Sequence, residues 1–172
     1  MGFINDITSR VELEKQIEAL SFKDSLTGLY NRTYLEVRAK PALEEAKLPV
    51  TVVMADCNYL KKTNDTYGHE YGDLLLKRVA RIIRSALPEG CTALRLGGDE
   101  FMILCEGRGA KETEAILEDI QARFVRESDD RIPLSVAFGC HTTTEGPFSF
   151  PEAYRQEDRA MYENKREMHE AE

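Results

Sequence analysis

The sequence lacks three features that would assign the protein to a specialised class. Its four cysteines include no CxxC pair, so neither a zinc site nor a disulfide framework is indicated, and a reducing cytoplasm fits best. No apolar run approaches the length of a membrane span, and the N-terminus has no signal-peptide pattern. Basic residues are the minority, because 23 Lys and Arg face 31 Asp and Glu, for a net charge of −8. This balance disfavours nucleic acid and anionic lipid as partners.

What is present is an ordinary globular composition, 42% apolar and 31% charged, in a chain of 172 residues. That length is most simply one domain with a core of its own, and no internal repeat divides it. Apolar residues at helical spacing alternate along the chain with short β-branched runs. Helices are predicted up to about residue 48, where Pro41 disturbs the pattern, at 72–87, around 116–124 and from 151 onward. Strands are predicted at 49–57, at 132–140 and on both sides of Gly97. The expected class is α/β or α+β, with helices covering a sheet.

Residues 3–20 form a charged amphipathic segment that predicts a helix. Ile7 and Val11 share one stripe, while Leu13, Ile17 and Leu20 share a second stripe, displaced as by a stutter in a coiled coil. Two interpretations are weighted equally: a surface helix that packs on its own domain, or a dimerising helix that enters from an upstream sensor.

The stretch "RLGGDEFMIL" places two glycines and two acids between apolar strands. Asp56 ends another apolar strand, and carboxylates from adjacent strands suit Mg²⁺, which leaves coordination sites for substrate phosphates. Two such ions would neutralise a triphosphate and activate a hydroxyl. Gly97 and Gly98 would let a nucleotide lie on the bare backbone. A type I′ turn is the alternative, but it explains one glycine and not the acids Asp99 and Glu100.

Further polar residues crowd within eighteen positions of Asp56. Lys61 suits a phosphate as a point charge. Asn64 and Asp73 together suit a purine edge, because a carboxylate accepts from the ring N–H and exocyclic amine that guanine presents side by side. Each alone is more often a solvated loop residue, and it is their density that favours a binding site.

Four further segments stand in a fixed order along the chain: "DSLTGLYNR" (24–32), "DCNYLKKTNDTYGHEYGD" (56–73), "RLGGDEF" (95–101) and "EDRAMYENK" (157–165). Together they resemble the successive motifs of the GGDEF family of diguanylate cyclases. The resemblance implies an α+β fold, with a central, mostly antiparallel sheet wrapped by helices and related to nucleotidyl-cyclase and polymerase palm domains. It assigns residues 22–172 to the catalytic domain. Residues 1–21 resemble the tail of a PAS-type sensor and its signalling helix, so a longer parent chain is expected, and a membrane location of that parent is left open.

The implied activity is the condensation of two GTP into cyclic di-GMP and two pyrophosphates, with Mg²⁺ or alternatively Mn²⁺. The resemblance implies a head-to-tail homodimer in which each protomer presents one GTP. A second hypothesis is a catalytically weak GGDEF domain that binds GTP and transmits a signal. A purely structural adaptor is the third, and the intact acids count against it.

The resemblance also implies a role for each matching residue. Asp56 and Asp99 would ligate the metal with the Cys57 carbonyl, and Glu100 would assist at the metal and at the attacking 3′-hydroxyl. The substrate-binding set, which holds guanine, the phosphates and the open hairpin, is Asn64, Asp73, Leu60, Lys61, Gly97, Gly98 and Lys165.

The chain departs from the family pattern at three places. Asn58 replaces a frequent second Asp, a harmless change. His169 stands where an Arg for the phosphates is often found, so triphosphate binding is expected to be weaker, pH-dependent or served by Arg166. The family's inhibitory RxxD motif is absent, because the matching stretch is "PEGC" (88–91), and no product inhibition is expected there. Asp73 is intact, which favours GTP over ATP.

Overall fold

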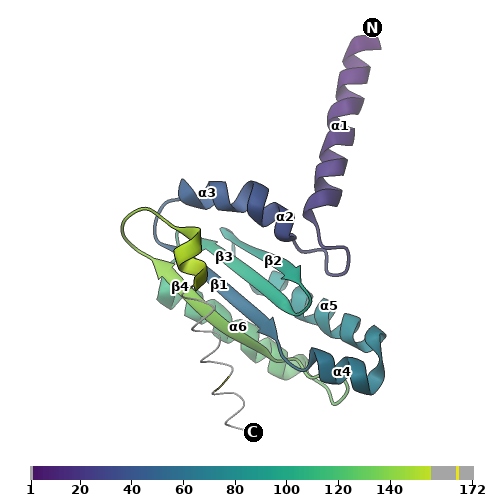
Figure 1. Ribbon diagram of the computed structural model, residues 1–172, viewed down its shortest axis with the longest axis vertical. Coiled ribbons are helices and arrows are strands. Elements are labelled where there is room, and N and C mark those ends of the chain that lie inside the picture. Colours follow the sequence, from purple (N-terminus) through teal and green to yellow (C-terminus); the bar gives the residue numbers. More distant parts are fainter. Residues whose placement is uncertain (1, 156–165, 167–172) are drawn as a thin grey trace.

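The structure is a computed structural model that describes residues 2–155 and residue 166 (Figure 1). Its centre is a single sheet with the strand order β2-β3-β1-β4, and every pair of neighbours is antiparallel. The strands are β1 (Val50–Cys57), β2 (Cys91–Gly97), β3 (Glu100–Glu106) and β4 (Val136–Thr143). The predicted α+β class is thereby confirmed.

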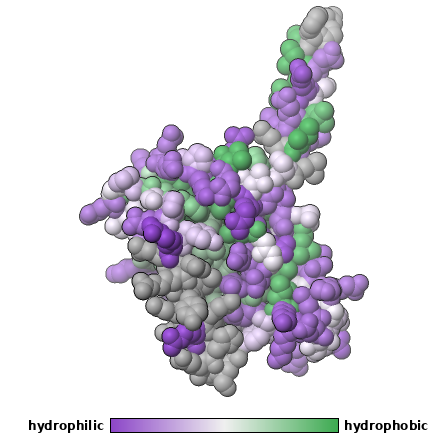
Figure 2. Space-filling model, in the orientation of Figure 1, coloured by the Kyte–Doolittle hydropathy of each residue, from purple (hydrophilic) through white to green (hydrophobic). Residues whose placement is uncertain are grey.

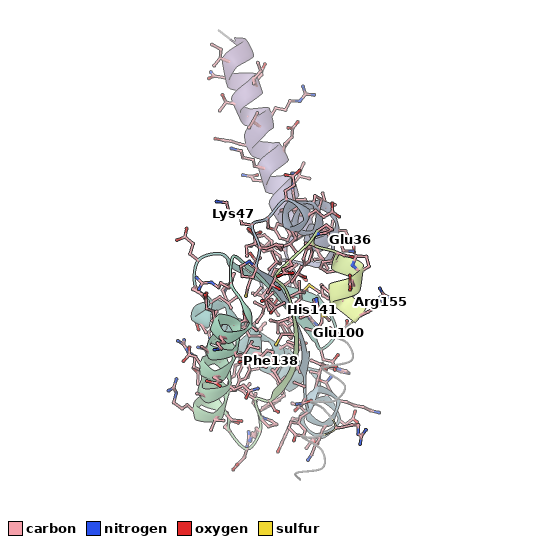
Figure 3. All side chains as sticks on the ribbon, turned by 90° about the vertical axis from the view of Figure 1, so that its left-hand side faces the viewer. Glu36, Lys47, Glu100, Phe138, His141 and Arg155 are labelled. Atoms are coloured by element: carbon pink, nitrogen blue, oxygen red, sulfur yellow. The ribbon has the colours of Figure 1, made fainter. Side chains whose placement is uncertain are left out.

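Helices cover both faces of this sheet. They are α1 (Gly2–Phe22), α2 (Arg32–Tyr34), the π-helical turn η1 (Leu35–Ala39), α3 (Lys40–Glu44), α4 (Leu60–Tyr67), α5 (His69–Ala86) and α6 (Ala110–Glu127), and residues 150–155 are also helical. Alternation along β1 sends Val53 and Ala55 into a core with α5 and α6, whereas Val52 and Met54 enter a second core with η1, α3 and the 150–155 helix. Figure 3 shows Phe138 on the α6 side of the sheet and Glu100 on the side of the 150–155 helix. The sheet is therefore the middle of three layers.

Helix α1 projects from the body of the molecule (Figure 1). Its apolar side chains stay in solvent, with Ile4 75% and Ile17 56% exposed, and Figure 2 shows hydrophobic residues along its length. Within the described part of the chain, no helix combines the length and the hydrophobicity that a membrane crossing requires.

Several predicted boundaries were wrong. The helix before β1 ends at Glu44 rather than residue 48, and the turn before Pro41 is widened into η1, where a proline has no N–H for the helical ladder. The polar stretch after Asp56 contains α4, which the sequence analysis missed, and α5 begins at His69 rather than residue 72. Strand β4 begins at Val136, four residues later than expected.

Candidate nucleotide and metal site

The β2–β3 turn explains both glycines by its backbone. Gly97 has φ 146° and Gly98 has φ 50°, conformations that L side chains rarely adopt. A Cβ at either position would meet no atom within 4 Å, so the space over the turn is open, as the predicted approach of a nucleotide requires. A bulge between Arg95 and Gly97 shifts the register and leaves Asp99 at the tip.

Acidic residues meet at this end of the sheet. Asp56 lies directly opposite Glu100 on the neighbouring strands β1 and β3, so both side chains are on the same face. The backbone N–H of Cys57 donates to the Asp99 carbonyl at 2.8 Å, which ties the tip of the turn to the end of β1. Like charges placed opposite each other destabilise a sheet unless a cation joins them. Arg32 reaches only to 3.9 Å from Glu100 and both side chains are about half exposed, so this ion pair is weak.

This arrangement fits a magnesium ion better than a closed metal cage. Among the described residues, no three His, Cys, Asp or Glu side chains converge into a complete ligand set. Mg²⁺ is commonly held by one or two carboxylates together with waters and substrate phosphates. Asp56, Asp99 and Glu100 supply hard oxygen donors of this kind, and the remaining ligands would come from the substrate.

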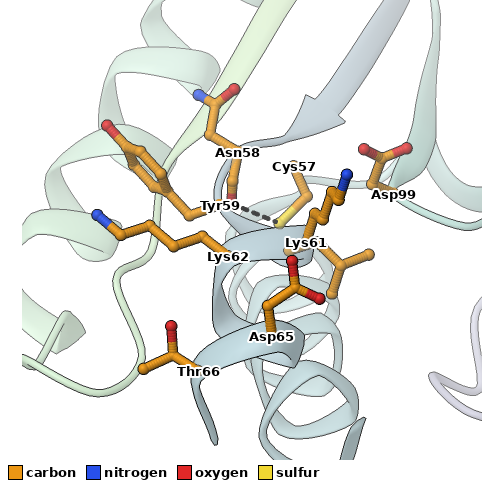
Figure 4. Close-up of a pocket in the computed structure, with 9 residues that line it drawn as sticks. Cys57, Asn58, Tyr59, Lys61, Lys62, Asp65, Thr66 and Asp99 are labelled. Atoms are coloured by element: carbon orange, nitrogen blue, oxygen red, sulfur yellow. Dashed lines mark hydrogen bonds between the residues drawn. The ribbon is translucent and has the colours of Figure 1, made fainter. Parts of the chain in front are cut away.

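A pocket of about 510 Å³ opens beside these carboxylates, at the start of α4 (Figure 4). Its lining residues are Cys57, Asn58, Tyr59, Leu60, Lys61, Lys62, Asp65, Thr66 and Asp99. In Figure 4, Lys61 extends toward the side on which Asp99 lies, and Lys62 extends the other way. The pocket therefore combines an acidic side, at Asp99, with the ammonium of Lys61.

The N-terminus of α4 faces this pocket. Tyr59 precedes the helix in a left-handed conformation, with φ 66°, and it is the only such non-glycine residue among those described. Its carbonyl accepts from the Thr63 N–H at 2.9 Å, so the helix starts immediately and the N–H groups of Leu60 and Lys61 have no intrahelical acceptor. Such N–H groups and the helix dipole favour anions, phosphates included.

The two residues predicted to hold guanine come together where α4 packs on α5. The Asn64 side chain lies so close to Gly72 that a Cβ there would sit 1.7 Å from Asn64 Oδ1, so only glycine fits. This Oδ1 is buried and accepts no hydrogen bond within the described residues. Asp73 follows Gly72 and is exposed. Asn64 therefore packs against the residue that precedes Asp73, and the guanine-binding role of both residues stays a prediction.

Arg95 is a positioning residue that the sequence analysis quoted but did not assign. Its Nη1 donates to both carboxylate oxygens of Asp24 at 3.1 Å, and its Nε and Nη2 donate to the Gly98 carbonyl at 3.1 and 2.8 Å. Burial alone would raise the pKa of Asp24, but hydrogen bonds from Thr27 and Arg95 outweigh it and hold that pKa below its ordinary value. The sequence feature that could have identified Arg95 is a charged residue inside an otherwise apolar strand.

The remaining predicted residues have two different outcomes. Lys165 and His169 lie outside the described residues, so their roles stay predictions. Asn58 donates from Nδ2 to the Ser135 hydroxyl at 3.0 Å, which fastens the end of β1 to the segment before β4. The stretch 88–91 forms the turn from α5 into β2, and the absence of product inhibition there also stays a prediction.

Comparison with known proteins leads to the same family as the sequence motifs. Residues 21–171 match the family described as "Diguanylate cyclase, GGDEF domain". A diguanylate cyclase of Vibrio cholerae is 32% identical over 173 residues, which cover 96% of this chain and 53% of the relative. The probable diguanylate cyclase DgcT of Escherichia coli is also 32% identical, over 95% of this chain and 37% of the relative. The chain therefore spans about half, or less, of these relatives.

Solved structures agree with this assignment. The coiled coil and GGDEF domain of DgcB from Caulobacter crescentus, in complex with c-di-GMP, matches with a TM-score of 0.83 and 26% identity, over 96% of this chain and 93% of that one. Diguanylate cyclase SiaD from Pseudomonas aeruginosa, in complex with its activator SiaC, matches with a TM-score of 0.79 and 27% identity, over 96% and 67%. By its fold, its carboxylates and its family match, the chain belongs to the GGDEF-domain family of diguanylate cyclases.

Proposed function

We propose that this chain condenses two GTP molecules into cyclic di-GMP and two pyrophosphates, as the output domain of a longer signalling protein. The observation that carries the proposal is that Asp56 and Glu100 face each other across β1 and β3, at the end of the sheet where Asp99 lines the pocket beside the N-terminus of α4. Carboxylates and an anion-binding helix end, side by side, suit a triphosphate that arrives with Mg²⁺. The test is turnover of GTP to a cyclic dinucleotide in the presence of Mg²⁺.

Each group at the site has a definite task in this proposal. Asp56, Asp99 and the Cys57 carbonyl would hold Mg²⁺, which supplies charge neutralisation and activation of a hydroxyl. The N–H groups of Leu60 and Lys61 would bind phosphate oxygens, with the Lys61 ammonium beside them. Glu100 would accept the proton of the attacking 3′-hydroxyl. Lys165 is proposed to bind the outer phosphates.

The base specificity of the site gives a first prediction. Asp73→Ser is expected to lower the preference for GTP over ATP by about tenfold to a hundredfold, because a hydroxyl replaces the carboxylate that accepts two guanine N–H bonds. The measurement is the ratio of kcat/KM for the two nucleotides. Glu70→Gln, an exposed change in the first turn of α5, is the control. An unchanged GTP/ATP ratio in the Ser variant would refute the guanine role of Asp73.

A homodimer is part of the proposed mechanism, because each protomer presents one GTP and the two must face each other. Helix α1 is proposed to hold the protomers together. Its apolar residues Ile4, Ile7, Val11, Leu13 and Ile17 are all between 42% and 75% exposed, which favours a dimerising helix over one that packs on its own domain. A second copy of α1 would cover this surface, as in a coiled coil.

Deletion of residues 1–20 tests the role of α1. The truncated chain is expected to lose specific activity most at low protein concentration and to recover it as the concentration rises, because dimerisation limits the rate. Turnover over a hundredfold range of protein concentration measures this effect. A full-length chain and a truncated chain with the same, concentration-independent specific activity would contradict it.

The second candidate function, a GTP-binding regulatory module, is favoured by His169 at the place of the family's phosphate-binding Arg. A neutral imidazole would hold the outer phosphates less well at neutral pH. Calorimetric titration with GTP and Mg²⁺, beside a turnover assay on the same sample, separates the two functions. Binding with turnover supports the cyclase, and binding without turnover supports the module.

A further inference from the structure

Two of the four cysteines face each other across neighbouring strands, away from the nucleotide site. Cys91 of β2 is the register partner of Cys105 of β3, and their Sγ atoms are 3.1 Å apart. The adjacent pair, Gly90 and Glu106, is joined by a hydrogen bond from the Glu106 N–H to the Gly90 carbonyl. Cys91 and Cys105 therefore occupy a non-hydrogen-bonded position, where paired Cα atoms of antiparallel strands are closest. Both side chains also project toward the core beneath α5 and α6.

The two thiols differ in access. Cys105 is fully buried, whereas Cys91 is partly exposed. Cys91 lines a hollow of about 200 Å³ whose other walls include Lys23 and Arg84, so a small molecule can approach this residue from a basic side.

The two thiols also differ in reactivity. A hydrogen bond with Cys105 lowers the pKa of Cys91 to about 7, against the raising effect of burial, and the Arg108 guanidinium lowers it further. The hydrogen bond with Cys91, together with burial, raises the pKa of Cys105. The buried Nε of Arg108 makes no hydrogen bond within the described residues, so it can still donate to an oxygen carried by Cys91. One thiol is thus a nucleophile and the other a buried resolving partner.

We propose that Cys91 and Cys105 form a peroxide-oxidised dithiol site that closes into a disulfide across β2 and β3. The Cys91 thiolate attacks one oxygen of a hydroperoxide, the O–O bond breaks, and the departing alkoxide or hydroxide takes a proton from solvent. Cys91 is then a sulfenic acid. The Cys105 sulfur attacks the Cys91 sulfur, the S–O bond breaks, and the hydroxide leaves as water with the Cys105 proton. The dithiol loses two electrons and the peroxide gains them.

The two cysteines are 14 positions apart and lie on either side of the turn that carries Gly97, Gly98 and Asp99. The ring closed by the disulfide would therefore contain this turn. A cross-link of this span restricts the unfolded chain and needs little movement in the folded one. Oxidation is therefore expected to raise Tm by roughly 5–10 °C, reversibly on reduction.

Peptide mapping of the full chain tests the proposal without any variant. After brief treatment with hydrogen peroxide and alkylation of the remaining thiols, trypsin cleavage at Arg95 separates Cys91 from Cys105. The expected product is a linked pair of peptides, 85–95 with 96–108, that dithiothreitol separates. The exposed Cys140 is the internal control, and Cys91 is expected to react about tenfold faster. Oxidation of Cys140 first, with peptides 85–95 and 96–108 unlinked, would overturn the proposal.

Two variants assign the roles of the sulfurs. In Cys105→Ala, a dimedone probe is expected to label Cys91, because its sulfenic acid has no partner thiol. In Cys91→Ala, Cys105 is expected to remain unlabelled after the same treatment. Labelling of Cys105 would reverse the assignment and overturn the proposed order of steps. Peptide linkage and dimedone labelling report thiol chemistry and not GTP turnover. A negative result would therefore overturn the dithiol proposal and leave the cyclase proposal untouched.

Discussion

An Asp99→Asn variant is expected to lose at least about a thousandfold in GTP turnover while it folds normally. Asp99 lines the pocket at the tip of the β2–β3 turn, and the amide would remove an anionic ligand from the proposed metal. Stability should change by less than about 0.5 kcal/mol, because the side chain is only partly buried and packs into no core. Initial rates with Mg²⁺, together with a urea unfolding curve, measure both effects.

The control for this variant is Asp119→Asn. Asp119 lies on α6 and pairs with Arg123 at the surface, so it undergoes the same chemical change far from the pocket. Its turnover should match that of the unmodified chain. Near-normal rates in Asp99→Asn would contradict the assignment of Asp99 to the metal.

Arg95→Ala is expected to affect both stability and activity. The Arg95 side chain is 12% exposed, and its guanidinium joins the Asp24 carboxylate to the Gly98 carbonyl, so its removal leaves a partly buried charge and an unsupported turn. The expected loss is about 2 kcal/mol of unfolding free energy. Turnover should fall about tenfold to a hundredfold, because the turn positions Asp99.

Two further variants define this effect. Arg95→Lys should recover little, since an ammonium cannot make the forked contacts to Asp24 and Gly98 together. Arg81→Ala, which breaks the exposed pair with Glu127, should cost under about 0.5 kcal/mol and leave turnover unchanged. Equal unfolding free energies for the Arg95 and Arg81 variants would refute the bridging role of Arg95.

The same contact predicts a pH dependence. The folded-state pKa of Asp24 is depressed, so its stabilisation is complete above the ordinary value of 3.8 and is lost as the pH falls through the lower folded-state pKa. The stability difference between the unmodified chain and Arg95→Ala should therefore be constant from pH 7 to 5 and shrink below about 3.8. Urea midpoints across this range measure it, and a difference that grows on acidification would contradict the assignment.

Periodicity predicted the elements that bury a face. The β-branched run of β1 and the spaced apolar residues of α5 and α6 each have such a face, and these elements were found. Helix α4 was missed because its residues are polar and only Thr63 among them is buried. Its stability comes from packing against α5, a tertiary contact that no local pattern reports.

The position of the candidate site was also predicted only in part, because some of its contacts depend on tertiary structure. A carboxylate at a strand end beside an acidic hairpin indicated where the metal site would be, and the strands do pair there. That Glu100, rather than Asp99, lies opposite Asp56 depends on the register between β1 and β3, which a sequence does not display. The bond between Arg95 and Asp24 joins residues 71 positions apart, so it becomes visible only in the folded chain.

This chain is proposed to make a cyclic dinucleotide from GTP. The most direct measurement is an incubation with GTP and Mg²⁺ over a range of protein concentrations, with the product separated by chromatography and Asp99→Asn run in parallel. We expect cyclic di-GMP with two pyrophosphates per product, a rate that rises more steeply than linearly with protein concentration, and no product from the variant. GTP that is bound but not converted at any protein concentration would contradict the cyclase and leave the GTP-binding module.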